Sequence, residues 1–154
     1  MNGPLGVREV SRHLPAAAAV GRTLLVACRP VDAAAKVGVL HDAYRAFNQR
    51  RVDDLLGMMV ADVEWPDVAR GTVLRSHDEV RAYWLAQFEA ASPVVEPTDF
   101  VGAGDDLVAV VRQQVFDHAG APLTDAVTVF HRYTFHEEKV AAMTVDTDRA
   151  SALA

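Results

Sequence analysis

Residues 40–84 read LHDAYRAFNQRRVDDLLGMMVADVEWPDVARGTVLRSHDEVRAYW. Apolar side chains recur at three- and four-residue spacing over residues 37–48, which predicts an amphipathic helix with one buried stripe. The same spacing over residues 52–60 predicts a second, short helix. Residues 63–65 are expected to form a short strand that Pro66 ends, because proline cannot donate to a strand ladder. The domain therefore opens with two helices and a strand.

A third helix has a clear start signal. Ser76 followed three residues later by Glu79 fits a capping box, in which each side chain binds the backbone N–H of the other residue. The apolar residues that follow share one helical stripe, formed by Val80, Tyr83, Trp84 and Phe88.

After Pro93 the pattern changes to alternating and β-branched residues. Turn-forming residues divide this part into four predicted strands, at residues 94–100, 107–116, 126–135 and 140–145. Three helices followed by consecutive strands indicate an α+β fold. We expect a curved antiparallel or mixed sheet wrapped around the three N-terminal helices.

Composition limits the classes of partner. The chain has 154 residues, 51% of them hydrophobic, and a net charge of −6 without a Lys/Arg stripe, which argues against nucleic acid. No apolar run is long enough to cross a bilayer, so no membrane partner is expected. The single cysteine, Cys28, allows no intramolecular disulfide, and the histidines lack ligand-type spacing. We expect neither a metal nor a cofactor.

Three segments are predicted: an Ala-rich extension over residues 1–36, a domain over residues 37–148 and a C-terminal tail over residues 149–154. The extension resembles an export signal, and the residues before Cys28 resemble a lipoprotein cleavage box. Because Arg22 interrupts the apolar run, we predict a cytoplasmic protein. Export as a lipoprotein through Cys28 is the alternative.

Side chains alternate between the two faces of a strand, so two rows can be assigned to one face. Gln113 is the polar member of the row that starts at Leu107, and His131 and Tyr133 are the polar members of the row that starts at Val127. An apolar lining with a few converging polar groups is typical of a small-molecule pocket. We expect these three residues to orient an apolar ligand, with walls formed by Trp65, Tyr83, Trp84 and Phe88.

The alternative is a filled core in which these polar groups satisfy one another. Phe130 and Val110 are predicted on the outer face of the sheet. The carboxylates Asp62, Glu64 and Asp67 are interpreted as a solvated rim rather than as an acid or base.

The ordered set of motifs Ala46-Phe47-Asn48, Asp53-Asp54-Leu55-Leu56, Asp62-Val63-Glu64-Trp65, Glu79–Trp84 and Tyr133-Thr134-Phe135 resembles the SnoaL-like group of the nuclear transport factor 2-like superfamily. The resemblance covers residues 37–146. It implies the ketosteroid isomerase-like cone, an apolar pocket and a homodimer formed through the outer sheet face. Functions in the superfamily range from isomerases, cyclases, dehydratases and epoxide hydrolases to proteins that only bind.

The resemblance also implies where catalytic groups would lie. Trp65 occupies the place of the ketosteroid isomerase base, and the oxyanion-binding tyrosine falls at Ala43, with Tyr44 expected on another face. The second donor falls on His131. The acidic residue of the cyclase-like members falls at Val145, with Asp146 adjacent but alternating outward unless a bulge turns it inward.

Three hypotheses follow. The first is a protein that binds a small apolar molecule, with catalysis left open. The second is an isomerase, cyclase, dehydratase or epoxide hydrolase-like enzyme that needs no cofactor, with His131 as acid or base and Tyr133 or Asp146 as helper, because histidine titrates near neutral pH. The third is a dimerisation or protein-interaction module with a filled core.

Overall fold

The computed structural model describes residues 33–154, and Cys28 and the segment that resembles an export signal lie outside them. The chain divides into two units, Met1–Ala35 and Lys36–Ala154. Residues 33–48 are helical. The elements that follow are α2 (Val52–Gly57), β1 (Met59–Asp67), β2 (Thr72–Leu74), α3 (His77–Ala90), β3 (Ser92–Ala103), β4 (Asp106–Phe116), β5 (Val127–His136), β6 (Lys139–Asp146) and α4 (Arg149–Leu153).

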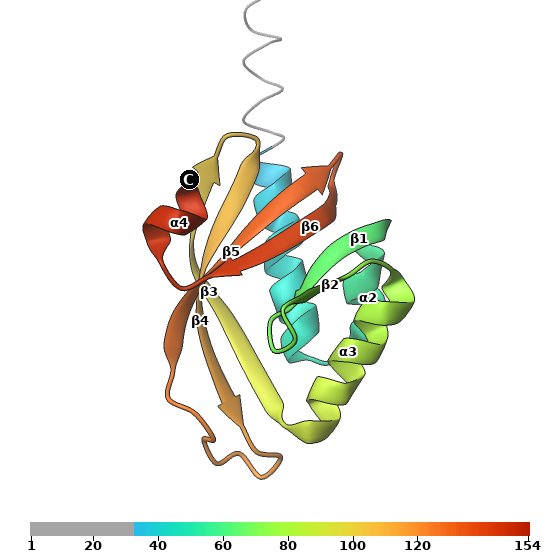
Figure 1. Ribbon diagram of the computed structural model, residues 1–154, viewed down its shortest axis with the longest axis vertical. Coiled ribbons are helices and arrows are strands. Elements are labelled where there is room, and N and C mark those ends of the chain that lie inside the picture. The colour runs from blue at the N-terminus through green and yellow to red at the C-terminus, as the bar shows by residue number, and fades with distance from the viewer. Residues whose placement is uncertain (1–32) are drawn as a thin grey trace, which may run out of the picture. The chain divides into compact units, whose positions relative to one another are not determined.

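The strands form one six-stranded sheet in the order β2-β1-β6-β5-β4-β3 (Figure 1). All neighbours are antiparallel except β1 and β6, which are parallel. Bulges interrupt the register between Pro97 and Asp99 in β3 and opposite Thr134 and Phe135, where the extra residue lies in β6. Such bulges bend a strand and increase its twist, which suits the curvature of this sheet. The predicted α+β class, with helices against a curved mixed sheet, is confirmed.

Two predicted boundaries are wrong. The second helix ends at Gly57 rather than at residue 60, and the apolar residues after it begin β1. Glycine weakens a helix by its conformational freedom, so the helix ends there although the apolar spacing continues. Pro66 does not end its strand: it pairs with Val73 of β2, while the parallel pairing with β6 stops at Glu64. The missing N–H is tolerated because β1 has one neighbour at that point.

The predicted N-cap of α3 at Ser76 is confirmed, since Ser76 accepts a hydrogen bond from the backbone N–H of Glu79 at 3.1 Å. The reciprocal half of the capping box differs from the prediction: the Glu79 carboxylate accepts from the Ser76 hydroxyl at 3.4 Å. Asn48 fixes the end of the preceding long helix to the sheet, since its side chain donates to the carbonyl of Val95 at 2.7 Å and accepts from its N–H at 3.0 Å. The Asn48 contacts hold the end of this helix against β3.

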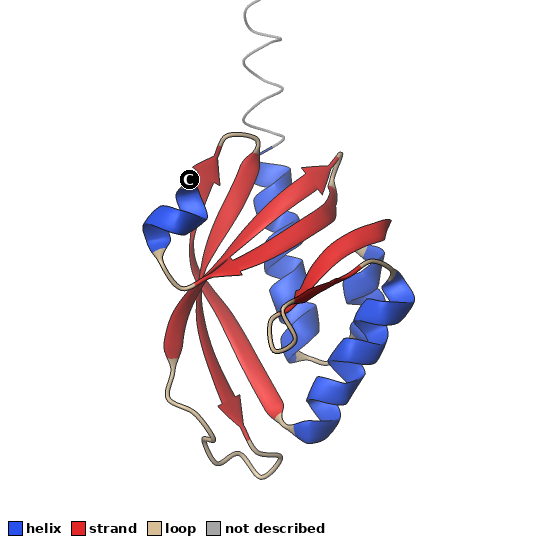
Figure 2. Cartoon of the chain, viewed as in Figure 1, coloured by secondary structure: helices blue, strands red, loops and turns tan. Residues whose placement is uncertain are grey.

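Two hydrophobic clusters lie on opposite faces of the sheet. The larger contains the inner row of β4 and β5 and the helices over residues 33–48, α2 and α3. The smaller is formed by Val108, Phe130 and Ala152, with Val110 packed against it. Figure 2 shows α4 on the side of the sheet away from α2 and α3. The outward placement of Phe130 and Val110 is therefore confirmed, and the predicted tail contains a helix that covers part of that face.

Candidate functional site

A cavity of about 440 Å³ lies between the inner face of the sheet, the helix over residues 33–48 and α3. Its walls are largely apolar and come from α2, α3 and every strand except β2, with Phe47, Leu55, Met58, Met59, Trp65, Trp84, Val95, Val129, Val140, Met143 and Val145 among the lining residues. Exposed Val68 and Val127 lie where the cavity meets solvent. A filled-core interaction module would lack a hollow of this size, so the cavity argues against the third hypothesis.

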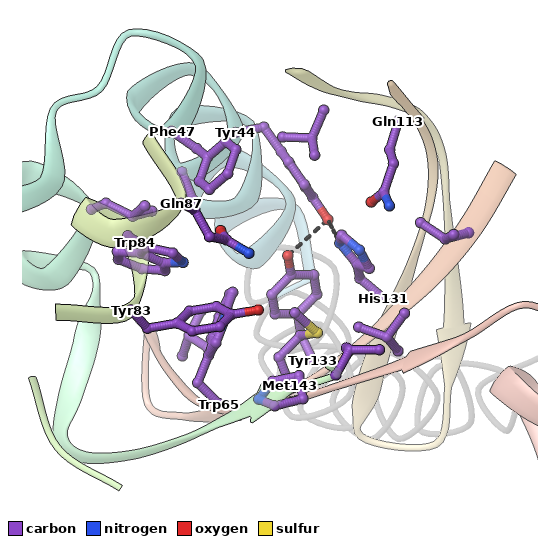
Figure 3. A pocket seen from close by; sticks show the side chains of 18 of the residues that line it. Tyr44, Phe47, Trp65, Tyr83, Trp84, Gln87, Gln113, His131, Tyr133 and Met143 are labelled. Atoms are coloured by element: carbon purple, nitrogen blue, oxygen red, sulfur yellow. Dashed lines mark hydrogen bonds between the residues drawn. The ribbon is translucent and has the colours of Figure 1, made fainter. Parts of the chain in front are cut away.

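Three polar side chains form a hydrogen-bonded chain at the floor of the cavity (Figure 3). The Tyr133 hydroxyl donates to the Tyr44 hydroxyl at 2.7 Å, and the Tyr44 oxygen lies 2.8 Å from Nδ1 of His131. All three residues are buried, with exposed fractions of 4%, 5% and 7% for Tyr133, Tyr44 and His131. The chain joins β5 to the first described helix across the cavity floor.

One arrangement of hydrogens satisfies the whole chain and leaves Nε2 of His131 as a donor. In it Tyr133 donates to Tyr44, and Tyr44 donates its single hydrogen to Nδ1 of His131. The imidazole hydrogen is then on Nε2. Within the described residues Nε2 has no hydrogen-bond partner, although no polar side-chain atom there is both fully covered and unpaired. In this arrangement Nε2–H is a donor open to the cavity.

Burial keeps the floor uncharged. It lowers the pKa of His131 from 6.5 to about 4, so the ring is neutral at pH 7. Burial also raises the pKa of Tyr44, and the charge that Tyr133 would carry if ionised raises it further. The pKa of Tyr133 is raised by burial as well. The floor therefore offers neutral hydrogen-bonding groups rather than a charge.

The helical wall carries further polar groups. Tyr83, Trp84 and Gln87 of α3 line the cavity opposite His131, and Gln113 lines it from β4. Burial and the nearby Asp67 carboxylate raise the pKa of Tyr83. Within the described residues the side chains of Gln87 and Gln113 have no hydrogen-bond partner in the protein.

Most of the predicted site residues meet at this cavity. His131, Tyr133, Trp65, Tyr83, Trp84 and Gln113 all line it. Whether they contact a ligand or take part in catalysis stays a prediction.

Two predicted site residues lie elsewhere. Phe88 packs against Phe47 at 5.1 Å between ring centroids and under the Arg50 guanidinium, outside the lining. Asp146 pairs with Phe130 in the β5–β6 register, so both point to the outer face. The bulge in this ladder lies opposite Thr134 and Phe135, too far along the strand to turn Asp146 inward.

The placement of Tyr44 was wrong in the sequence interpretation. Tyr44 was expected on another helical face than Ala43, yet both line the cavity. The signal was present in the spacing of Leu40, Tyr44 and Phe47, four and three residues apart, which is the spacing of one helical stripe.

Asp67 also departs from the predicted solvated rim. Asp62 and Glu64 are exposed, but Asp67 is buried, with 4% of its surface accessible. Its carboxylate accepts the backbone N–H of Arg70 at 3.2 Å and lies 3.8 Å from the Arg70 guanidinium. These contacts give Asp67 a structural role in the turn between β1 and β2.

The chain belongs to the SnoaL-like domain family, whose model matches residues 40–143. This match agrees with the resemblance and with the cone architecture described above. A search of the curated proteins found no match. No helix in residues 33–154 has the length and apolar character needed to cross a membrane.

Solved structures with the same fold include three that carry informative descriptions. TerC, co-crystallised with polyporic acid, is 18% identical with a TM-score of 0.64 and covers 76% of this chain and 94% of its own. SalBIII, an epoxide hydrolase/cyclase-like enzyme of pyran ring formation in salinomycin, is 16% identical with a TM-score of 0.64 and coverages of 77% and 95%. RV0760c of Mycobacterium tuberculosis, in complex with estradiol-17beta-hemisuccinate, is 12% identical with a TM-score of 0.63 and coverages of 75% and 95%. At these identities the likeness shows the fold.

Proposed function

We propose that the cavity binds a small, largely apolar and uncharged molecule, oriented at the floor by His131 and Tyr133 and at the side by Gln113. The observation that carries this proposal is the Tyr133–Tyr44–His131 chain, which is buried, neutral and open to the cavity at Nε2. An apolar wall supplies affinity through burial, and a few fixed polar groups orient the ligand. The ligands of TerC and RV0760c, polyporic acid and estradiol hemisuccinate, support small-molecule binding in this fold.

An anionic group would bind poorly at the floor. Burying an unpaired carboxylate is costly unless a positive charge or several donors compensate it. The floor supplies neither, because His131 stays neutral at pH 7 and the two tyrosines bind each other.

Matched neutral and anionic compounds test this proposal. We expect 2-acetylnaphthalene to bind at least about tenfold more tightly than 2-naphthoate, a difference of about 1.4 kcal/mol, in titrations followed by tryptophan fluorescence. His131→Ala and Gln113→Ala should each lower the affinity for 2-acetylnaphthalene. Leu85→Ala, at an exposed position of α3 outside the cavity, is the matched control. Equal affinity for the carboxylate, or no binding of either compound, would contradict the proposal.

A second candidate is an enzyme, an isomerase, cyclase or dehydratase, in which His131 acts as acid or base. The open Nε2 atom favours it, since a reacting group must lie within hydrogen-bond reach. The lowered pKa makes His131 a weak base at pH 7, and Asp146 lies on the other face of the sheet. Binding is therefore the better supported function. Turnover of a bound compound that His131→Gln abolishes without loss of affinity would reverse this preference.

We also propose a homodimer formed through the outer sheet face and a cytoplasmic location. The apolar Val94, on the strand β3 and 37% exposed, supports the dimer, while α4 restricts it to the part of the face away from Val108. A monomeric mass by light scattering would contradict the dimer. Fractionation with the mass of the mature N-terminus tests the location.

A further inference from the structure

The cavity contains a second buried donor, on the wall opposite His131. Trp84 has 1% of its surface exposed and lines the cavity from α3. Its indole nitrogen can only donate, and within the described residues it has no hydrogen-bond acceptor. Figure 3 shows the nitrogen edge of Trp84 turned toward the space between α3 and the sheet. Because no polar side-chain atom of the described residues is both fully covered and unpaired, this nitrogen is accessible from the cavity and is a candidate for ligand contact.

The two donors are separated by apolar surface. Trp84 contacts Trp65 with ring centroids 5.3 Å apart, and Trp65 in turn contacts Tyr133 at 6.5 Å, whereas Trp84 has no ring contact with His131. Both groups are N–H donors on opposite walls of one hollow. A ligand with a single polar atom would leave one of them unpaired.

We propose that the cavity is built for a dicarbonyl compound: an uncharged apolar scaffold with two acceptor oxygens at separate ends, one bound by His131 Nε2–H and the other by Trp84 Nε1–H. This inference rests on the proposed function and specifies its ligand class. Carbonyl oxygens fit because they accept hydrogen bonds and carry no hydrogen that would face these donors. The remaining wall, which includes Met143 and Val129, supplies the apolar contact.

Three compounds of one shape test the claim on the full chain. They are 1,4-diethylbenzene, 4-ethylacetophenone and 1,4-diacetylbenzene, which carry no, one and two carbonyl groups on the same ring. Dissociation constants are measured for wild type and for Trp84→Phe, and each ketone is compared with diethylbenzene in the same variant. The affinity ratio cancels any change that affects all three compounds equally, such as a general loosening of the pocket.

We expect Trp84→Phe to lower the affinity for diacetylbenzene, relative to that for diethylbenzene, by about tenfold, because one carbonyl is left without a donor. The monoketone 4-ethylacetophenone can turn its oxygen to His131. Its affinity relative to that of diethylbenzene should therefore be the same in Trp84→Phe as in wild type. His131→Ala should lower the relative affinity for diacetylbenzene by a similar factor. Phe88→Leu is the packing control, since Phe88 lies outside the cavity lining, packs against Phe47 at 5.1 Å between ring centroids and carries no donor. The affinity ratios of this variant should stay at the wild-type values.

A measurement on wild type avoids dependence on the variant's folding. The ¹⁵N–¹H resonance of the Trp84 indole, distinguished from that of Trp65 by Trp65→Phe, should move downfield in proton shift with diacetylbenzene and not with diethylbenzene.

Several outcomes would overturn the inference. An unchanged diacetylbenzene ratio in Trp84→Phe, with no movement of the resonance, would mean that the N–H faces the Trp65 ring. An equal loss in Phe88→Leu would assign the effect to packing. Both results would leave the proposed function intact, as long as the compounds bind. Failure of all three compounds to bind wild type would overturn the inference and the proposed function together.

Discussion

The two faces of β5 differ in how their side chains are covered. On the inner face His131 and Tyr133 border a hollow of about 440 Å³ and are joined through Tyr44. On the outer face Phe130 packs against Val108 and against Ala152 of α4. Adjacent residues of one strand therefore differ: Phe130 packs against α4, and His131 borders the cavity.

The contrast separates stability from function. Close packing gains dispersion and hydrophobic energy from every contact, whereas a hollow forgoes part of that gain and leaves room for another molecule. Arg132 strengthens the solid side, since it donates to Asp106 at 2.8 Å and to the Ala152 carbonyl at 3.1 Å. We therefore expect outer-face changes to act on folding and inner-face changes to act on binding and pH dependence.

The largest expected effect is on the outer face. Phe130→Ala should lower the free energy of unfolding by about 3–5 kcal/mol, because it removes a large buried ring and leaves a gap. Urea denaturation measures it. At temperatures where the variant is folded, its affinity for 2-acetylnaphthalene should equal that of wild type. A loss below about 1 kcal/mol would mean that α4 does not pack there in solution.

The next effect appears on acidification. The pKa of His131 is lowered to about 4 in the folded protein against 6.5 unfolded, so below pH 6.5 the unfolded chain takes up a proton that the folded chain refuses. Stability from this group is complete above pH 6.5 and is lost as the pH falls toward 4, by about 3 kcal/mol in total. His131→Gln should remove this component. Parallel stability curves for wild type and variant between pH 7 and pH 4 would refute the burial of a neutral ring.

A smaller effect distinguishes the members of the chain. Tyr44→Phe leaves Nδ1 of His131 and the Tyr133 hydroxyl without partners, and should cost about 2 kcal/mol. Tyr133→Phe removes only the end of the chain, so the Tyr44–His131 contact survives and the cost should be about 1 kcal/mol. Thermal unfolding of the two variants measures the difference. Equal costs would contradict the order of the chain.

The sequence predicted the regular parts of the fold well. The predicted strand over residues 107–116 differs from β4 by one residue, because the four valines in this segment favour a strand. Alternation along that strand and β5 correctly assigned Gln113 and His131 to one face. The Ser76 cap was equally local: two residues three apart contain all of its information.

Features that depend on distant partners were missed. The short β2 and the continuation of β1 through Pro66 exist through their pairing with each other, which no local pattern encodes. Tyr44 joins the floor because its hydroxyl meets Tyr133 and His131 from β5, nearly ninety residues further along the chain. The helix α4 is stabilised by the outer cluster, so its sequence alone resembled a tail.

The smallest expected effect concerns Asp146, which the inner-face interpretation needed as a catalytic helper. Register places it opposite Phe130, on the outer face and close to α4. Because no buried partner depends on its charge among the described contacts, Asp146→Asn should change the free energy of unfolding by less than about 0.5 kcal/mol. The ratio of the affinities for 2-acetylnaphthalene and 2-naphthoate should also stay at its wild-type value, because Asp146 lies outside the cavity. If its carboxylate were in the cavity, removing it would strengthen binding of the anion. A shift in that ratio would place Asp146 on the inner face and give His131 the acidic neighbour that the enzyme hypothesis requires.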